Sequence, residues 1–393
     1  MTAAQTTPYS ADAPPMTSFW KPLVDLEFVD QLQAFALEHV APEAARIDRE
    51  DVYPIEIIRA LAKAGFTQSI LAPEYGGCGD FRKIIALFEG IGYYSVSAAV
   101  SLISIFQAQT MLRLFGSREL NDLYIPKLAD GMAAAYSLTE EQHGSDIRSL
   151  DTKAQRDAEG NWILNGEKSF ITSGGGAEFL VLLAETAVGV SAFAVPYGEG
   201  CEKYIGVHSA TMGLRNGPHV NMRLKDVRLP ASHLIGIEGK GVRQAAMTLS
   251  FSRTCTAAMM TGVARAAFDG ALHRAQGRKA FDQTILNFQG IQWYFFFFFC
   301  DIEASRNLTY RAAEALNASD DVDRYSSVAK LMACRTATEV ALQAMQICGA
   351  YGTSDNTPFA RYLRDAKTYE IGAGSAEIMK NTIAKYILRG VAQ

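Results

Sequence analysis

The stretch Trp162-Ile163-Leu164-Asn165-Gly166-Glu167-Lys168-Ser169-Phe170-Ile171-Thr172 decides which class of fold we expect. Residues typical of β-strands stand on both sides of Asn165-Gly166, a dipeptide preferred in two-residue hairpin turns. We therefore predict that Trp162 to Leu164 and Lys168 to Thr172 form two strands that are joined at this turn.

Further strands are predicted on the C-terminal side of this stretch. Phe179 to Leu183 and Val190 to Val195 are short apolar runs, and Val220-Asn221-Met222-Arg223-Leu224 alternates as a half-buried strand should. From Tyr136 to about Ile237, the pattern predicts an antiparallel β domain, built as a small barrel or a sandwich.

On both sides of this β domain the apolar residues recur with a helical period. Before it, Phe28 to Val40 and Ile55 to Ala64 predict helices. After it, we predict four bundle helices, at Met247 to Ala275, Gln289 to Leu316, Ser326 to Cys348 and Ala376 to Leu388. The predicted fold is α+β and multidomain, with a loose leader at 1–24, an N-terminal helical domain at 25–134, a middle β domain at 135–238 and a C-terminal helical bundle at 239–393.

Composition excludes several classes of function. Of 393 residues, 37 are basic and 42 are acidic, which gives a formal net charge of −5. A mildly acidic chain without a basic block is a poor candidate for nucleic acid or an anionic membrane. The six cysteines form no CxxC pair and the histidines form no HExxH motif. We therefore expect no metal site, no secretory signal and a reduced, cytoplasmic protein.

Two apolar stretches raise the question of a membrane. Gly90 to Leu112 carries no formal charge over 23 residues, which is long enough to span a bilayer. Its serines and glutamines favour a buried core helix instead. The aromatic run Trp293 to Cys300 is too short to span, and because it covers every helical face we expect it to be buried on every face.

The motif Tyr136-Ser-Leu-Thr139-Glu-Glu-Gln-His-Gly144-Ser145-Asp146 is similar to T-E-x-x-x-G-S-D of the acyl-CoA dehydrogenase family. The chain resembles this family from about residue 25 to residue 390, through four separated motifs in the family's order. The family fold has N-terminal helices, a middle β-barrel and a C-terminal four-helix bundle. The resemblance implies that FAD is bound by Tyr136, Leu138, Thr139, Gly144 and Ser145. Gly144 would let the backbone approach a phosphate, and Thr139 would hydrogen-bond the flavin ring.

The second motif, Asn165-Gly166-Glu-Lys168-Ser-Phe170-Ile-Thr172, looks like the family's N-G-x-K-x-x-I-T. It implies that Phe170 lies against the isoalloxazine and that Thr172 bonds near its reactive nitrogen. The third motif is a signature of the family's β domain and implies a backbone shape more than a chemical role. It consists of Met212-Gly213-Leu-Arg215 followed by Val227-Arg-Leu-Pro230.

The fourth motif set lies in the predicted bundle and implies an oligomer. Arg278-Lys-Ala-Phe281 followed by Gln289 resembles R-x-x-F-G…Q, through which one family subunit touches its neighbour's cofactor. Gln346-Ile-Cys-Gly349 resembles the start of Q-x-x-G-G-x-G, which faces the adenylate part of FAD. The guanidinium group of Arg278 would suit the pyrophosphate of FAD. We expect a homodimer at least, with a tetramer as the family's commonest state.

The C-terminal motif Tyr369-Glu370-Ile-Gly372-Ala373-Gly374-Ser375-Ala-Glu377-Ile378 is similar to the family branch that reads Y-E-I-G-A-G-T-S-E-I. It implies that Gly374, Ser375 and Glu377 approach the flavin. In most members the catalytic glutamate stands where this chain has Ala373. In one branch it precedes an arginine, where this chain has Ser252-Arg253. By this resemblance the chain is an atypical member that lacks a carboxylate at both positions for the general base.

Substitutes for the base and contacts to the substrate are predicted from nearby residues. His143 is the candidate base because histidine titrates near neutrality, whereas Glu370 is expected to be structural. Ser145, Arg253, Ala373 and Gln107 are expected to contact the substrate. A polar Gln107 suits a hydroxylated or amino substrate, although Gln107 and Gln109 are two residues apart and cannot both face it squarely.

Three functions stay open. The first is an FAD-dependent oxidoreductase of acyl-CoA or acyl-carrier-protein thioesters, acting by α,β-dehydrogenation or a variant oxidation, as in secondary metabolism. Its electrons would pass to an electron-transfer flavoprotein or to oxygen. The second is a flavin monooxygenase or oxidase on the same fold, which would need no α-proton abstraction. The third is a partner protein without activity.

Overall fold

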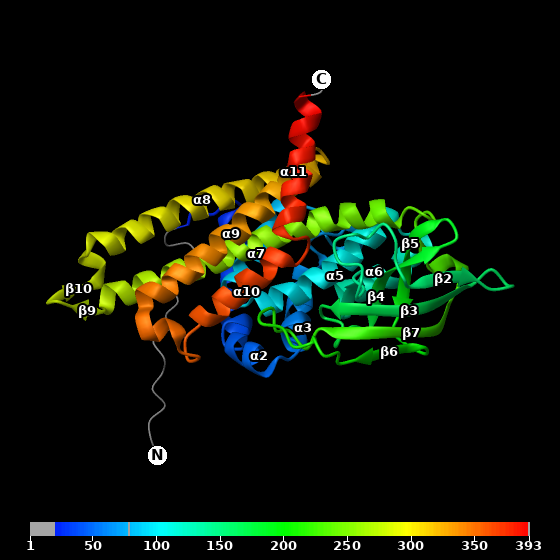
Figure 1. Cartoon of the computed structure of the whole chain (residues 1–393), viewed down its shortest axis with the longest axis horizontal. Helices are drawn as coiled ribbons and strands as arrows, with labels where there is room; N and C mark the ends of the chain where they lie inside the picture. Colours follow the sequence, from blue (N-terminus) through cyan, green and yellow to red (C-terminus); the bar gives the residue numbers. More distant parts are fainter. Residues whose placement is uncertain (1–19, 78, 392–393) are drawn as a thin grey trace, which may run out of the picture.

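The computed structural model describes residues 20–77 and 79–391, so most of the predicted leader lies outside the described residues. Figure 1 shows helices, a sheet at one end of the molecule, and three long helices that run towards the other end. The fold therefore has the helix–sheet–helix order that the sequence predicts.

The elements before the sheet are α1 (Leu26–Phe35), η1 (Ala36–Val40), α2 (Ala44–Glu50), α3 (Ile55–Lys63), η2 (Phe66–Gln68), η3 (Pro73–Tyr75), α4 (Phe81–Tyr94), α5 (Val96–Phe115) and α6 (Arg118–Ala129). The middle elements are β1 (Ala134–Ser137), β2 (Lys153–Arg156), β3 (Trp162–Ile171), β4 (Phe179–Thr186), β5 (Gly189–Pro196), β6 (Cys201–Tyr204), β7 (Val220–Leu229), η4 (Ala231–His233) and β8 (Leu234–Ile235). The last elements are α7 (Gly241–Gly277), β9 (Lys279–Ala280), β10 (Gln283–Thr284), η5 (Ile285–Asn287), α8 (Gln289–Ala318), α9 (Val322–Cys348), η6 (Gly349–Thr353), α10 (Phe359–Ile371) and α11 (Ala376–Val391). The four predicted bundle helices are confirmed, and α10 was not predicted.

The middle sheet separates two cores. Its strands run in the order β6-β7-β3-β2-β4-β5-β8, and most neighbours are antiparallel, as predicted. The exceptions are the parallel pairs of β4 with β1 and β2. Along β4, Leu180 and Leu182 face the core inside the β domain, whereas Phe179 and Val181 face the helices. A strand buried on both faces in this way joins the β domain to the helical domain.

The prediction of a hairpin at Asn165-Gly166 is wrong. Residues 162–171 form one strand, β3, which pairs with β7 and shifts register between Leu164 and Gly166. Gly166 has φ of 144°, and a Cβ there would lie 2.5 Å from the Thr152 Cα, so the glycine serves a bulge and a close approach. The hairpin between β2 and β3 turns instead at 157–161, where Asp157 Oδ1 accepts hydrogen bonds from the Glu159 and Asn161 amides.

Helices α4 and α7 cross in direct backbone contact. A Cβ added to Gly92 would lie 2.8 Å from the Met259 Cα, and one added to Gly262 would lie 2.3 Å from the Glu89 carbonyl oxygen. Beside the crossing, the buried Glu89 carboxylate accepts hydrogen bonds from Arg265, Arg306 and Tyr310. The two guanidinium groups and the phenol together satisfy this carboxylate, which would be costly to bury without partners.

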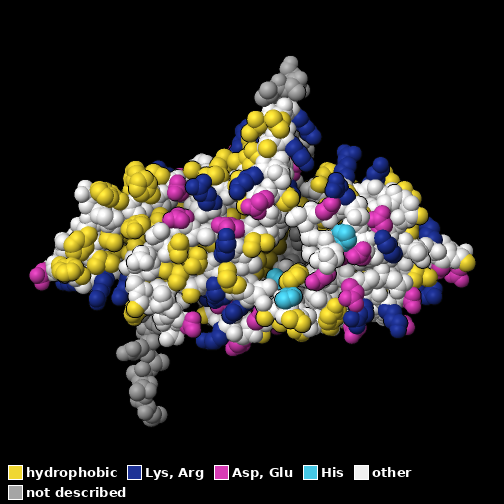
Figure 2. All heavy atoms as spheres, viewed as in Figure 1, with side chains coloured by type: hydrophobic (Ala, Val, Ile, Leu, Met, Phe, Trp, Pro, Cys, Tyr) yellow, Lys and Arg dark blue, Asp and Glu magenta, His cyan; other side chains and the backbone are white. Residues whose placement is uncertain are grey.

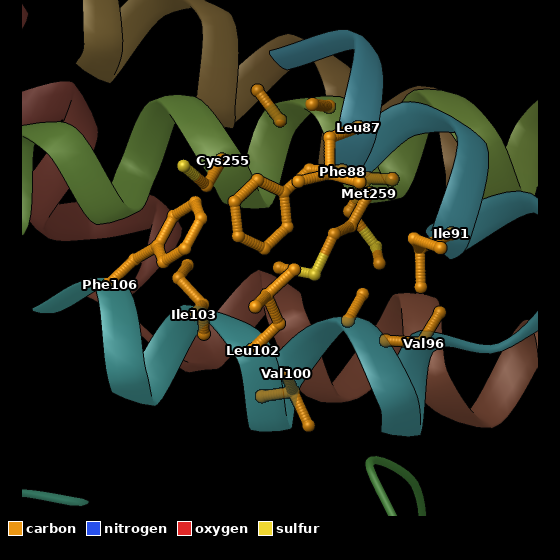
Figure 3. Packing of buried hydrophobic residues seen from close by; sticks show 14 of the residues in the cluster. Leu87, Phe88, Ile91, Val96, Val100, Leu102, Ile103, Phe106, Cys255 and Met259 are labelled. Carbon is orange, nitrogen blue, oxygen red and sulfur yellow. The ribbon is translucent and has the colours of Figure 1, made fainter. Parts of the chain in front are cut away.

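The uncharged stretch predicted as one helix contains a break at Ser95. This residue is extended, and its hydroxyl accepts a hydrogen bond from the Ala98 amide, so it ends α4 and caps α5. Among the described residues, α5 is the one helix long and apolar enough to cross a membrane. Of its most apolar stretch of 18 residues, 78% is buried within the fold. Figure 3 shows Ile103 and Phe106 of α5 directed towards Cys255 and Met259 of α7. The prediction of a core helix is confirmed.

Trp20 is fixed in the core although we placed it in the loose leader. It is 1% exposed, stacks on Phe299 at 5.2 Å between ring centroids, and meets the edge of Phe268 at 5.5 Å. Because these rings belong to α8 and α7, the chain already packs against the C-terminal helices before α1 begins. For residue 20 the prediction of a loose leader is therefore wrong.

The aromatic run on α8 is only half buried, contrary to our prediction. Phe295 and Phe298 are 8% and 3% exposed, whereas Trp293, Phe296 and Phe297 are 57%, 62% and 62% exposed. Phe295 and Phe298, which are three residues apart, lie on the side of α8 that faces α7. The exposed aromatic residues point outward, because a helix that packs on one side buries only one stripe of its surface. Figure 2 shows hydrophobic side chains gathered on this end of the molecule.

The loop 212–217 is held by residues from both ends of the chain. Asp365 Oδ1 on α10 accepts a hydrogen bond of 2.7 Å from the Leu214 amide, and Asp51 Oδ1 accepts one of 3.1 Å from the Gly217 amide. Arg364 Nη1 donates to both Asp48 Oδ1 and the Met212 carbonyl. The motif Met212-Gly213-Leu214-Arg215 thus joins the N-terminal helices, the sheet and α10.

We expect Asp365 to make the stability of the protein depend on pH. Burial raises the pKa of Asp365 to about 6, although the Leu214 amide opposes this shift. The pKa in an unfolded chain is about 3.9. The folded protein thus binds the extra proton between these two values, and its stability falls as pH rises through them.

Asp365→Asn keeps an oxygen for the Leu214 amide but does not ionise. We expect the variant to unfold at a higher denaturant concentration than the wild type at pH 7.5, with a smaller difference at pH 4. Asp320→Asn, at an exposed position, is the control. An Asp365→Asn effect that is equal at both pH values would contradict this prediction.

Candidate active site

The loop between α10 and α11 carries the centre of the candidate site. Ala373 and Gly374 both have positive φ, 56° and 99°. The buried Lys330 of α9 donates hydrogen bonds to the carbonyls of Gly374, at 2.7 Å, and Glu370, at 3.1 Å. An alanine in the left-handed region is strained, so a buried ammonium that fixes the carbonyls on both sides stabilises the conformation.

Arg253 lies next to this loop. Its Nη2 and Nε atoms are 3.6 Å and 3.7 Å from the position of a Cβ on Gly374. Nη1 binds the Asp323 carboxylate at 2.8 Å, and Nε is buried without a hydrogen-bond partner among the described residues. Asp323 is 60% exposed. The Arg253 guanidinium group therefore pairs with an exposed carboxylate through Nη1 and keeps a buried N–H donor available on Nε.

Ser252 precedes Arg253 and faces α5. Its hydroxyl donates to the Thr248 carbonyl at 3.1 Å and accepts from Gln107 Nε2 at 2.9 Å. Gln109 is buried and donates to the Thr67 carbonyl. As the two-residue spacing predicts, only one of the two glutamines points to this region, and it is Gln107.

A buried ion pair holds the first motif. Lys168 Nζ on β3 lies 2.7 Å from Glu140 Oε1 and 3.2 Å from the Leu138 carbonyl. Glu140 also accepts hydrogen bonds from the amides of Asp151 and Thr152. Burial lowers the pKa of Lys168 to about 8, while the carboxylate opposes the shift. Lys168 thereby fixes the backbone of Leu138 and Thr139 beside β3.

Several residues of the first two motifs are suited to a flavin. Tyr136 Oη is buried and has no partner among the described residues, so a polar group of a ligand would satisfy it. Leu138 is buried, while Thr139 and Thr172 are half-buried. Phe170 has φ of 54° and is 44% exposed, with its ring parallel to that of His208. Together they offer an open aromatic face and hydroxyl donors, which suits an isoalloxazine.

Gly144 and Ser145 are exposed, and nothing lies within 4 Å of a Cβ on Gly144. An open backbone of this kind can approach a phosphate. In the C-terminal motif, Ser375 is half-buried and Glu377 is exposed. The residues present therefore fit the pyrophosphate and ring of FAD.

The other predicted cofactor residues lie far from this group within one chain. Figure 1 places β9, β10 and the junction of α9 with α10 at the end of the molecule opposite the sheet. These segments carry exposed residues: Arg278, Phe281, Gln289, Gln346 and Gly349. Phe281 is 89% exposed. One chain does not bring both groups together, so they can share a cofactor only across two copies.

His143 and Glu370 have other partners. His143 Nε2 lies 3.5 Å from Asp151, and its backbone forms a turn with Glu140. The ligand atoms of Glu140, His143 and Asp151 lie within 4.8 Å of one another, yet Lys168 and two amides already occupy the Glu140 carboxylate. Glu370 pairs with Lys367. The role of His143 as a base and the structural role of Glu370 both remain predictions.

Two residues of this region were missed by sequence reasoning. Lys330 and Asp323 are polar residues on α9 that touch the candidate site from outside the motifs. The signal available for Lys330 was a lysine flanked by apolar residues, in Ser327-Val328-Ala329-Lys330-Leu331, on a predicted bundle helix. That pattern shows burial but names no partner.

We expect Lys330→Met to loosen the loop that carries Ala373. The variant keeps the length of the side chain but removes two hydrogen bonds from a charged donor, each worth about 1.5–3 kcal/mol. Hydrogen exchange at residues 371–375 should be at least about tenfold faster. Lys385→Met, at an exposed position on α11, is the matched control. Unchanged exchange in this segment would show that other contacts hold the loop.

Family models match nearly the whole chain. The N-terminal, middle and C-terminal domains of acyl-CoA dehydrogenase match residues 25–132, 135–227 and 239–388. The chain is 33% identical over 374 residues to the probable acyl-CoA dehydrogenase FadE25 of Mycobacterium tuberculosis, covering 92% of this chain and 95% of that one.

Two solved structures are similar over the same span. Butyryl-CoA dehydrogenase from Megasphaera elsdenii has a TM-score of 0.89 and 30% identity, covering 93% of this chain and 99% of that chain. PigA, solved with FAD and proline, has a TM-score of 0.86 and 26% identity, covering 93% and 98%. The likeness extends through all the regions that carry the candidate site.

Proposed function

Because the chain belongs to the acyl-CoA dehydrogenase family of FAD-dependent oxidoreductases, we propose that it oxidises an acyl thioester carried by CoA or by a carrier protein. The observation that supports this most directly is the Ala373–Gly374 loop, fixed by Lys330 beside Arg253. The reaction would be α,β-dehydrogenation or a variant oxidation.

FAD would be held by two copies of the chain. One copy would supply Tyr136, Leu138, Thr139, Gly144, Ser145, Phe170, Thr172, Gly374, Ser375 and Glu377, and the other Arg278, Phe281, Gln289, Gln346 and Gly349. When bound, FAD accepts a hydride equivalent from a carbon atom of the substrate. The Lys168–Glu140 pair would keep Leu138 and Thr139 at the flavin edge.

The substrate contacts follow from the same geometry. The Ala373 amide would donate to the thioester carbonyl, and the neighbouring guanidinium of Arg253 would favour negative charge on that oxygen. Ser145 would contact the substrate from the first motif, and Gln107 from α5. We propose that neither Ala373 nor Ser252 serves as a general base, since neither side chain carries a carboxylate.

We propose a homo-oligomer, a dimer or a tetramer, in the cytoplasm. The exposed aromatic side chains of α8 and the 89% exposure of Phe281 favour burial against another copy. Helix α11 projects from the body in Figure 1, and a largely apolar groove of about 580 Å³ beside it is lined by Leu308, Tyr325, Val328, Ile383 and Ile387 together with Arg324 and Arg389. Electrons would leave to an electron-transfer flavoprotein or to oxygen.

The deciding experiment is an anaerobic titration of the purified flavoprotein with acyl-CoA and acyl-carrier-protein thioesters. Bleaching of the flavin absorption by a thioester is the expected result. A flavin that no thioester bleaches, but that NADH or a reductase reduces and oxygen reoxidises, would favour the second candidate, a monooxygenase or oxidase. The lack of a carboxylate at Ala373 and Ser252 is the observation that keeps this candidate.

We expect a carboxylate placed in the site to accelerate dehydrogenation. A general base contributes a factor of about 10² to 10⁴. Ala373→Glu and Ser252→Glu should therefore raise the rate of flavin bleaching by a simple acyl-CoA by about 10²-fold or more in at least one case. Ala373→Gln, which has the same shape without a base, is the control. If both variants bind FAD and thioester without any gain, the missing base is not what limits the reaction.

A further inference from the structure

Between Val96 and Leu112, Gln107 is the one residue of α5 that is not fully buried. Gln107 reaches across to α7, where its partner Ser252 stands directly before Arg253. The half-buried Gln107 amide therefore lies between α5 and α7, against the residue that precedes Arg253.

The hydrogen bonds of Ser252 fix the orientation of this amide. A serine hydroxyl has one proton, and the Ser252 proton is donated to the Thr248 carbonyl at 3.1 Å. Towards Gln107 the hydroxyl can only accept, at 2.9 Å, so the amide must present its NH₂ group. The Gln107 Oε1 atom then points away from Ser252.

That oxygen is available to a ligand. Within the described chain the Gln107 side chain makes no other hydrogen bond, and its oxygen is not among the buried atoms that lack a partner. Because a carbonyl oxygen accepts and does not donate, the group that complements it is an O–H or N–H donor. An alkyl chain placed there would leave the oxygen desolvated and unpaired.

We propose that Gln107 is a specificity-determining residue that selects thioesters whose acyl group carries a hydroxyl or a protonated amine. This inference rests on the proposed function. It assigns to one atom, Gln107 Oε1, the discrimination between acyl groups that carry a donor and purely alkyl groups. Ser252 has a positioning role, because it holds the amide in the orientation that exposes this atom.

The test uses butyryl-CoA, 4-hydroxybutyryl-CoA and 4-aminobutyryl-CoA, which differ at a carbon away from the α and β positions. The holoenzyme is compared with Gln107→Leu and with Gln107→Met, a variant of similar length. Gln31→Leu, at an exposed position on α1 where the side chain donates a hydrogen bond to Glu27, is the control. Thermal unfolding and FAD content establish that each variant is folded.

We expect the wild type to prefer a donor-bearing thioester over butyryl-CoA by at least about tenfold in kcat/KM for flavin bleaching. Both Gln107 variants should lose this preference, and Gln31→Leu should keep it. Gln107→Glu keeps an acceptor and adds a charge, so it should shift the preference towards 4-aminobutyryl-CoA. A wild type without preference, or variants that keep it, would overturn the proposal.

Equilibrium binding separates this inference from the proposed function. The three thioesters are titrated while perturbation of the flavin spectrum is followed without turnover. If no thioester reduces the flavin but Gln107→Leu abolishes a binding preference for the donor-bearing ligands, oxidation of thioesters is excluded and selection by Gln107 stands. If thioesters reduce the flavin and the variants bind and react with unchanged preference, oxidation of thioesters stands and selection by Gln107 is excluded.

Discussion

The backbone contact between α4 and α7 at Gly92 and Gly262 is the constraint on which the rest of the structure depends. A side chain at either glycine would push the helices apart, and the cluster around Glu89 would lose its geometry, because Arg265 and Arg306 reach it from α7 and α8. The crossing also keeps the middle of α7 inside the protein, where no side chain from Ser250 to Asp269 is exposed. Ser252 and Arg253 are consequently presented inside the protein, to α5 and to the Ala373 loop.

The candidate site contains positive charge but no general base at the two positions discussed. Arg253 and the buried Lys330 both lie against the loop at Gly374, while the carboxylate of Asp323 stands at the rim. Such an arrangement favours negative charge on a bound carbonyl. In the reaction that we propose, the protein would therefore contribute more to polarising the thioester than to removing its proton.

The order of the domains and most of the long elements could be predicted from periodicity, because helices and half-buried strands repeat differently. The bulge at Gly166 could not, since Asn-Gly suits both a hairpin and a strand whose neighbour approaches closely, and only the Thr152 contact decides between them. The sequence motifs identified Gly374 and Arg253. They did not identify Lys330, because its role depends on a contact with a residue 44 positions away in the sequence. The half exposure of the aromatic run also followed from packing on one side, which composition does not reveal.

The contacts of the loop 212–217 have a consequence for how the protein is assembled. Leu214 is bound by Asp365, 151 positions later, and Gly217 by Asp51, 166 positions earlier, while Asn216 donates to Ser101 of α5. Contacts at such separations form late in folding, since each requires a long loop to close. The loop 212–217 should therefore be fixed only after α10 has been synthesised, and chains interrupted before α10 should expose this loop to proteases.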